Sequence, residues 1–161
     1  MRIVTIGGYG FTEAGFLDAL QKAGVDTFVD IRQRRGMRGA KYAFLNSSRL
    51  QSLLASAGIR YVHAIDLAPT ASVRDAQKEN DRAAGIAKRD RTQLSQAFVQ
   101  KYRSEILARF DAERLRRALN GATAVALFCV EGPPSACHRS LAAEHLLQVF
   151  GSDQPVEHLR P

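Results

Sequence analysis

Residues whose side chains can do chemistry gather near the end of this chain. Cys129 and Glu131 follow an apolar run typical of a buried strand, and Cys137-His138-Arg139 follows a short loop rich in glycine and proline. The triplet stands at the predicted start of an amphipathic helix, where free N–H groups and the helix dipole attract anions. We therefore predict an anion site at this turn, with His138 and Arg139 holding a phosphate or carboxylate.

The two thiols allow several roles. Cys129 ends the predicted strand, and a neighbouring Arg or His would favour its thiolate and make it an optional nucleophile. Seven residues separate it from Cys137, which fits neither a CxxC redox pair nor the Cys-x5-Arg loop of cysteine phosphatases. Packing in the core is the favoured alternative.

We predict no metal, because a zinc site with Cys129, Cys137, His138 and His63 has nonstandard spacing and adjacent Cys-His pairs rarely face one metal. A disulfide between the thiols is a further alternative.

Polar residues also follow other predicted strands. Asp30 is either a proton acceptor or the partner of Arg32 in a structural bridge. Gly7 opens a Gly-Gly-Tyr-Gly turn, but Glu13 replaces the third glycine of a dinucleotide fingerprint. The catalytic candidates are Asp30, Cys129, Glu131 and His138. The anion-binding candidates are Gly7, Arg32, Arg38, His63, Cys137 and Arg139.

Amphipathic segments alternate with strand-like segments and so predict the elements that position these residues. Four segments end in a glycine that can close a helix, at Gly24, Gly58, Gly121 and Gly151. Thr12, Ser47 or Ser48, and Asp111 are predicted helix caps. The predicted strands are Ile3–Ile6, Thr27–Ile31, Ile59–His63, Ala124–Cys129 and Val156–Leu159.

This alternation predicts an α/β fold: a three-layer, Rossmann-like open sheet of about five mostly parallel strands, with helices on both faces. We predict the strand order 3-2-1-4-5, with ligands bound beyond the carboxyl ends of the strands. Residues 1–161 form a single predicted domain. The stretch 72–92 is crowded with both charges and is interpreted as an exposed helical insertion, either a lid over the site or a solvated helix.

The charge of the chain favours phosphate-bearing partners. The formal net charge is +7, and residues 31–65 contain seven Lys or Arg and no Asp or Glu. Such a local basic field attracts a nucleotide or nucleic acid, although a solvated basic surface has the same pattern. No apolar run approaches the ~18 residues of a membrane span. The start of the chain enters a strand without a signal segment and cysteines are few, so we expect a cytoplasmic protein.

Read in order, these motifs resemble the bacterial and archaeal family catalogued as domain of unknown function 488. The resemblance covers nearly the whole chain, and its last motif is the specific one. It implies a compact α/β protein with a shared polar site and leaves the reaction open. The matching pieces are Thr5-Ile6-Gly7, Val29-Asp30-Ile31-Arg32 with a basic loop to Arg38 and Phe44, Gly58-Ile59-Arg60-Tyr61 with His63, and Cys129-x-Glu131 followed by Cys137-His138-Arg139.

Two departures from the family pattern bear on the shape of the pocket rim. Where the family usually has Pro and then Ser-Arg, this chain has Arg35 and then Met37-Arg38. Where the family tends to have Leu-Gly, the chain has Leu67-Ala68.

Three functions compete. The first is an enzyme, a hydrolase or transferase, that acts without a cofactor on a phosphate-bearing small molecule or nucleic acid. Its anion would be clamped by arginines, and Asp30 or Glu131 would move a proton. The second is a non-catalytic module that grips nucleic acid through residues 32–60. The third is a thiol redox or metal protein. The sequence does not indicate the oligomeric state of the protein.

Overall fold

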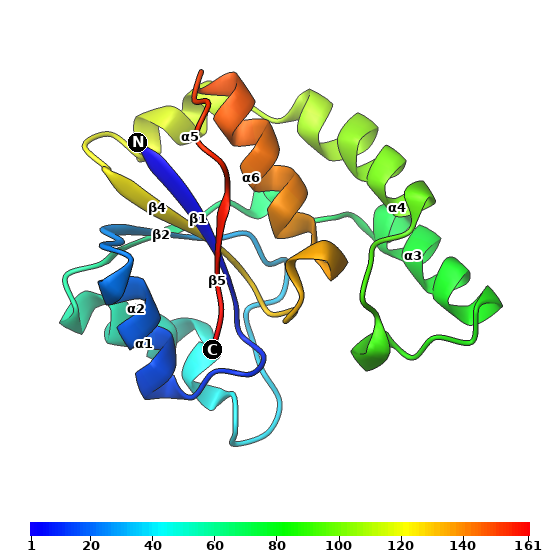
Figure 1. Ribbon diagram of the computed structural model, residues 1–161, viewed down its shortest axis with the longest axis horizontal. Coiled ribbons are helices and arrows are strands. Elements are labelled where there is room, and N and C mark those ends of the chain that lie inside the picture. Colours follow the sequence, from blue (N-terminus) through cyan, green and yellow to red (C-terminus); the bar gives the residue numbers. More distant parts are fainter.

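The computed structural model describes residues 1–161, apart from the side chain of Arg89. Its centre is a five-stranded, all-parallel sheet in the order β3-β2-β4-β1-β5, with helices on both faces (Figure 1). The predicted α/β class is confirmed. The strands are β1 (Arg2–Gly7), β2 (Thr27–Asp30), β3 (Arg60–His63), β4 (Ala124–Cys129) and β5 (Glu157–Leu159).

The predicted strand order was wrong in one respect. β4 lies between β1 and β2, whereas the order 3-2-1-4-5 placed it beyond β1. Both orders keep β1 beside β4, and the apolar pattern of the pair does not reveal which member β2 joins. In register, Gly7 lies opposite Cys129, and Asp30 lies opposite Phe128 on one side and His63 on the other. The predicted site residues at these strand ends therefore share one edge of the sheet.

Helices α1 and α2 cover one face of the sheet, and α3 to α6 pack on the other side (Figure 1). Alternation along β4 sends Phe128 to the α1 and α2 face and Cys129 to the α6 face. Cys129 therefore points toward the helix that begins with His138. The helices are α1 (Glu13–Lys22), α2 (Ser47–Ser56), α3 (Ala71–Ala83), α4 (Gln96–Lys101), α5 (Ala112–Ala118) and α6 (His138–Val149).

Local signals set most helix ends. Thr12 and Asp111 cap α1 and α5, as predicted. The cap predicted at Ser47 or Ser48 is wrong, because Asn46 holds the N-cap position and its side chain instead accepts a hydrogen bond from the Met37 amide at 2.6 Å. The four predicted closing glycines, Gly24, Gly58, Gly121 and Gly151, all have positive φ, between 61° and 81°.

The charged segment 72–92 begins as the long helix α3, which lies beside α4 at one side of the molecule (Figure 1). Buried Gln77 donates to Asp81 at 2.7 Å and accepts from the Ser95 amide at 2.7 Å. Arg91 pairs with Asp81 on the same network. These contacts hold the chain after α3 against the helix, and the role of a lid over the site stays a prediction.

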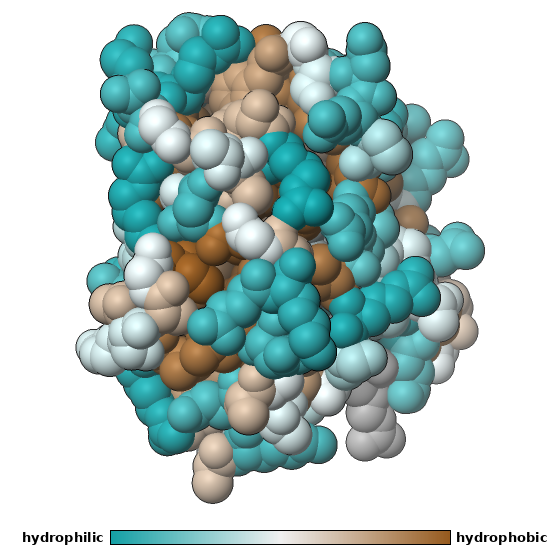
Figure 2. All heavy atoms as spheres, turned by 60° about the vertical axis from the view of Figure 1, so that its left-hand side comes forward, coloured by the Kyte–Doolittle hydropathy of each residue, from teal (hydrophilic) through white to brown (hydrophobic). Residues whose placement is uncertain are grey.

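The face of the molecule drawn in Figure 2 is mainly polar. In Figure 2 hydrophilic residues cover most of the visible face, and hydrophobic atoms show mainly between them. Across the described chain, no helix combines the length and apolar character that a membrane span requires.

Candidate active site

Asp30 and Arg32 form a buried ion pair at the end of β2. The guanidinium donates from Nε at 2.9 Å and from Nη2 at 2.7 Å to the two carboxylate oxygens. Tyr61 donates to the same carboxylate at 2.8 Å, and Arg32 also donates to the Leu45 carbonyl at 3.0 Å. The guanidinium stacks over the Phe128 ring. With its donors and acceptors engaged inside the protein, this pair fits the structural bridge, and a catalytic role for Asp30 stays a prediction.

Arg139 braces the loop that follows β4. Its side chain is 1% exposed and donates to the main-chain carbonyls of Glu131 and Gly132. The loop that Arg139 braces passes so close to Gly7 that a Cβ on this residue would lie 2.2 Å from the Glu131 carbonyl oxygen. Gly7 is thus required by packing, and the anion-binding roles predicted for Gly7 and Arg139 are not tested by these contacts.

His63 supports the same region from β3. Its Nε2 lies 2.9 Å from the main-chain oxygen of Arg32. The ring is therefore tied to the backbone that carries the buried ion pair, and it does not join the thiols.

Cys129, Cys137 and His138 form a compact cluster, called here the thiol–imidazole cluster. Their donor atoms lie within 4.8 Å of one another, and all three residues are buried. Cys137 is the N-cap of α6, and its Sγ lies 3.9 Å from Nδ1 of His138. The sequence spacing argued against a joint site, because adjacent Cys and His side chains rarely face one point. In this fold the donor atoms of Cys137 and His138 do lie close to that of Cys129, so the objection does not apply.

The two thiols of the cluster differ in acidity. A hydrogen bond to Cys137 and burial raise the pKa of Cys129 well above its usual value. Burial also raises the pKa of Cys137, but the hydrogen bond from Cys129 and the nearby His138 and Arg139 side chains outweigh it and lower that pKa well below the ordinary value. Cys137 is therefore the more acidic thiol of the pair, although the sequence favoured Cys129 as the nucleophile.

The cluster lies on the wall of a pocket of about 420 Å³, called here the basic pocket. Six cationic residues line it and Glu131 is its one acidic lining residue within the described part of the chain. The cations are Arg32, Arg34, Arg74, Lys78, Lys88 and Arg91. The pocket that the thiols border is thus lined by more positive than negative side chains.

Two of these cations have no carboxylate partner among the described residues. Arg34 is exposed, and Arg74 donates only to the neutral oxygens of Gln33 and Pro69. By contrast, Lys88 lies 3.1 Å from the Glu131 carboxylate, which raises the pKa of Lys88 although burial acts to lower it. Arg34 and Arg74 are therefore the side chains most open to an incoming anion.

The wall that carries Lys88 and Arg91 is joined to the loop before α6. The Leu94 amide donates to the Ser135 carbonyl at 3.0 Å, and the Ser135 hydroxyl donates to the Thr92 carbonyl at 2.6 Å. These bonds hold the charged segment over the basic pocket. Sequence reasoning missed Arg74, Lys78, Lys88 and Arg91 as site residues; their only signal was the dense mixed charge of the stretch 72–92.

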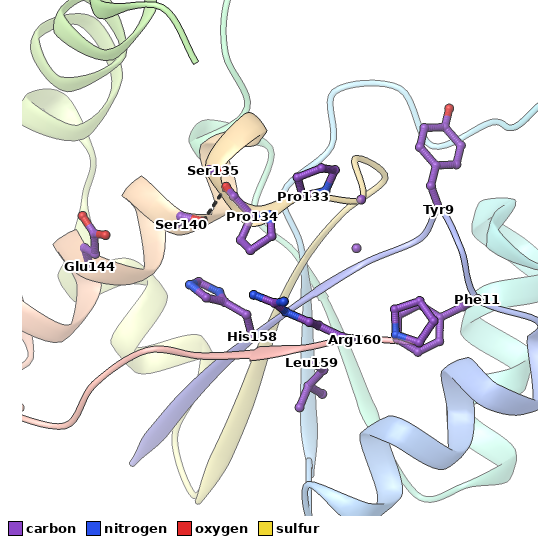
Figure 3. A pocket seen from close by; sticks show the side chains of 13 residues that line it. Tyr9, Phe11, Pro133, Pro134, Ser135, Ser140, Glu144, His158, Leu159 and Arg160 are labelled. Carbon is purple, nitrogen blue, oxygen red and sulfur yellow. Dashed lines mark hydrogen bonds between the residues drawn. The ribbon is translucent and has the colours of Figure 1, made fainter. Parts of the chain in front are cut away.

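Two other hollows flank the same edge of the sheet. One of them has a volume of about 640 Å³. Figure 3 shows Tyr9 and Phe11 on one side of it and Pro133 and Pro134 on the other, while His158 and Arg160 extend from the C-terminal strand below. Gly7 lines this hollow and no cysteine does among the described residues. Arg38 lies in another, with Tyr9, Arg34 and Tyr42. Four of the six predicted anion-binding residues are therefore divided among three hollows, and His63 and Arg139 line none of the three.

Two chemistries are open to the thiol–imidazole cluster. Without a metal, Nδ1 of His138 can take the Cys137 proton, and the thiolate can attack an electrophile bound in the basic pocket. Alternatively, the two sulfurs and the ring nitrogen can ligate one metal ion. Both place the reacting atoms on the wall of a cationic pocket.

Comparison with known proteins gives one result. The family model described as "Domain of unknown function DUF488" matches residues 13–146, which include every predicted site residue except Gly7. Comparison with curated proteins and with solved structures gives no match.

Proposed function

This chain belongs to the family described as domain of unknown function DUF488, and we propose that it is an enzyme acting on a phosphate-bearing substrate. The substrate is a nucleotide or a nucleic acid whose phosphate enters the basic pocket. The reaction takes place at the thiol–imidazole cluster. One observation carries the proposal: among the residues whose side chains the structure describes, six cations and a single acid line a pocket whose wall holds a buried thiol pair with a histidine.

Phosphate recognition follows from the available guanidinium donors. Arg34 and Arg74 can turn toward an anion without first breaking an ion pair. A planar guanidinium binds phosphate oxygens through two parallel hydrogen bonds, which lysine cannot do. Lys88 and Arg91 add positive charge to the same pocket. The pocket therefore suits a di-anionic phosphate better than a single carboxylate.

The experiment measures binding and turnover separately. Calorimetry with inorganic phosphate and with a nucleoside monophosphate should give binding to the wild-type chain and about tenfold weaker binding to Arg34→Ala, the usual loss for one charged hydrogen-bonding group. Arg117→Ala removes the same charge from an exposed site near the end of α5 and is the matched control. An equal loss of phosphate affinity in both variants would show that the effect comes from the overall charge of the protein and not from the pocket.

Turnover is then screened on phosphomonoesters and phosphodiesters. Cys137→Ser should retain phosphate binding and lose turnover, because it changes the cluster and leaves the cationic walls intact. Wild-type binding without turnover of any phosphate ester would contradict the enzyme and leave a binding protein.

A non-catalytic nucleic-acid module is the second candidate. Tyr9 is 39% exposed and shares a hollow with Arg34 and Arg38, and an aromatic ring beside cations suits a stacked base and its phosphate. Binding of single-stranded oligonucleotides should then weaken linearly with added salt on logarithmic axes. Affinity for oligonucleotides that Cys137→Ser leaves unchanged, with no turnover by wild type, would favour this module.

A further inference from the structure

The thiol–imidazole cluster has the donor set of a metal centre. Two sulfurs and one imidazole nitrogen lie within 4.8 Å of one another. A tetrahedral zinc ion bound by Cys and His holds its ligand atoms about 3.3–3.8 Å apart, from bond lengths near 2.3 and 2.0 Å. Small side-chain rotations therefore suffice to close the three donors around one ion.

The orientation of His138 matches that of a metal ligand. Its Nε2 lies 3.3 Å from the main-chain oxygen of Ile31, which can only accept a hydrogen bond. In the neutral ring this contact assigns the proton to Nε2 and leaves the lone pair of Nδ1 facing Cys137. Metal-binding histidines are usually held by such a hydrogen bond from the second ring nitrogen to a carbonyl.

Each donor is positioned by the fold rather than by a flexible loop. Cys129 ends the buried strand β4, and Cys137 and His138 stand at the first turn of α6. The backbone of a strand end and of a helix start thus sets where all three donor atoms lie. The site therefore needs little ordering when an ion enters.

The cluster offers three protein ligands and borders the basic pocket. Structural zinc sites use four protein ligands, whereas catalytic sites use three and leave the fourth position to water or substrate. We propose that Cys129, Cys137 and His138 bind one Zn²⁺ ion whose open fourth position faces the basic pocket. Metal binding is inferred from these side chains alone, whereas the role of the ion in the reaction rests on the proposed function.

Zinc is the ion that this donor set favours. Thiolate and imidazole ligands are too soft for Mg²⁺ or Ca²⁺, and an iron–sulfur cluster generally needs four cysteines, whereas this chain has two. A zinc ion at the pocket wall acts as a Lewis acid on phosphoryl oxygens, which suits a phosphate-bearing substrate.

The test measures metal content and coordination directly. Untagged protein, stripped with a chelator and then dialysed against Zn²⁺, should contain about one zinc per chain by elemental mass spectrometry. Co²⁺ in its place should give a thiolate-to-cobalt charge-transfer band and the strong visible bands of tetrahedral cobalt. Cys129→Ser, Cys137→Ser and His138→Ala should each lose the stoichiometric ion, and Arg34→Ala, in the pocket but without a ligand atom, should keep it.

The outcomes separate this inference from the proposed function. Folded wild-type protein that takes up no zinc and gives no cobalt band overturns the metal site, and Cys137 then acts as a free nucleophile if turnover is found. Zinc bound at one per chain without phosphate binding keeps the metal site and overturns the proposed substrate. If a serine variant fails to fold, the cobalt spectrum of the wild type still decides.

Discussion

Arg32 and Arg139 are buried at the carboxyl edge of the sheet, whereas Arg34 and Arg74 lie open or half-open along the basic pocket. The buried pair is 3% and 1% exposed and already donates to a carboxylate and to loop carbonyls. The open pair has no carboxylate partner among the described residues. Four arginines near one edge thus divide into two that hold the loops in place and two that can receive an anion.

The largest expected effect comes from breaking the buried ion pair. Asp30→Asn should destabilise the protein by about 3–5 kcal/mol, because it leaves a buried Arg32 without its counter-charge. Urea denaturation followed by circular dichroism measures this loss. If Asp30 were instead a catalytic base, the variant would keep its stability and lose only turnover.

Arg139→Ala tests the second buried arginine. It removes the donors that two loop carbonyls use and empties a buried site, so the free energy of unfolding should fall by about 3 kcal/mol. Arg139→Lys keeps the charge but not the two-pronged donor and should recover only part of the loss. A fully stable Arg139→Ala protein that no longer binds phosphate would restore Arg139 as an anion-binding residue.

Asp26 is a structural carboxylate at the edge of the sheet opposite these buried charges, and its contribution to stability can be measured as a function of pH. Burial raises the pKa of Asp26, but hydrogen bonds from Thr123, Thr27 and Ala124 lower it to about 2. Because the folded-state pKa lies below the unfolded value of about 3.9, the stabilisation is complete above pH ~4 and is lost as the pH falls toward 2.

The expected size is about 1 kcal/mol, reduced from the full shift because Asp26 is partly open to solvent. Thermal unfolding between pH 2 and 6 measures it, with Asp26→Asn as the comparison. That variant should be less stable at pH 6 and should approach the wild type near pH 2. A constant difference over this range would contradict the assignment.

The smallest effect should come from the acid of the basic pocket. Glu131→Gln releases Lys88 and removes the one acidic residue among the described residues that line the pocket, so phosphate should bind about threefold tighter. Glu113→Gln, which removes an exposed helix ion pair on α5, is the control and should leave binding unchanged. Tighter binding with lower turnover would assign Glu131 a part in proton transfer, whereas weaker binding would contradict the proposed charge balance.

Several features of the fold were predictable because they depend on local sequence. Closing glycines and the caps Thr12 and Asp111 fix helix ends within a few residues, and apolar runs mark buried strands. The order of β1, β2 and β4 was not predictable, because the similar apolar patterns of β1 and β4 do not show which of the two strands pairs with β2. The basic pocket was missed for a related reason: in the sequence Arg74 and Lys88 have the pattern of surface charge, and only the fold places them on the pocket that Cys137 also lines.

The sequence by itself determined the alternation of strands and helices and the presence of Cys129, Cys137, His138 and several arginines near the predicted strand ends, since periodicity and composition are properties of neighbours along the chain. Only the tertiary structure decided which cations are already paired and which are open. It also decided that two thiols and an imidazole face one point. The physical reason is that hydrogen-bond partners and burial come from residues far apart in sequence, and these determine whether a charged side chain braces the fold or binds a ligand.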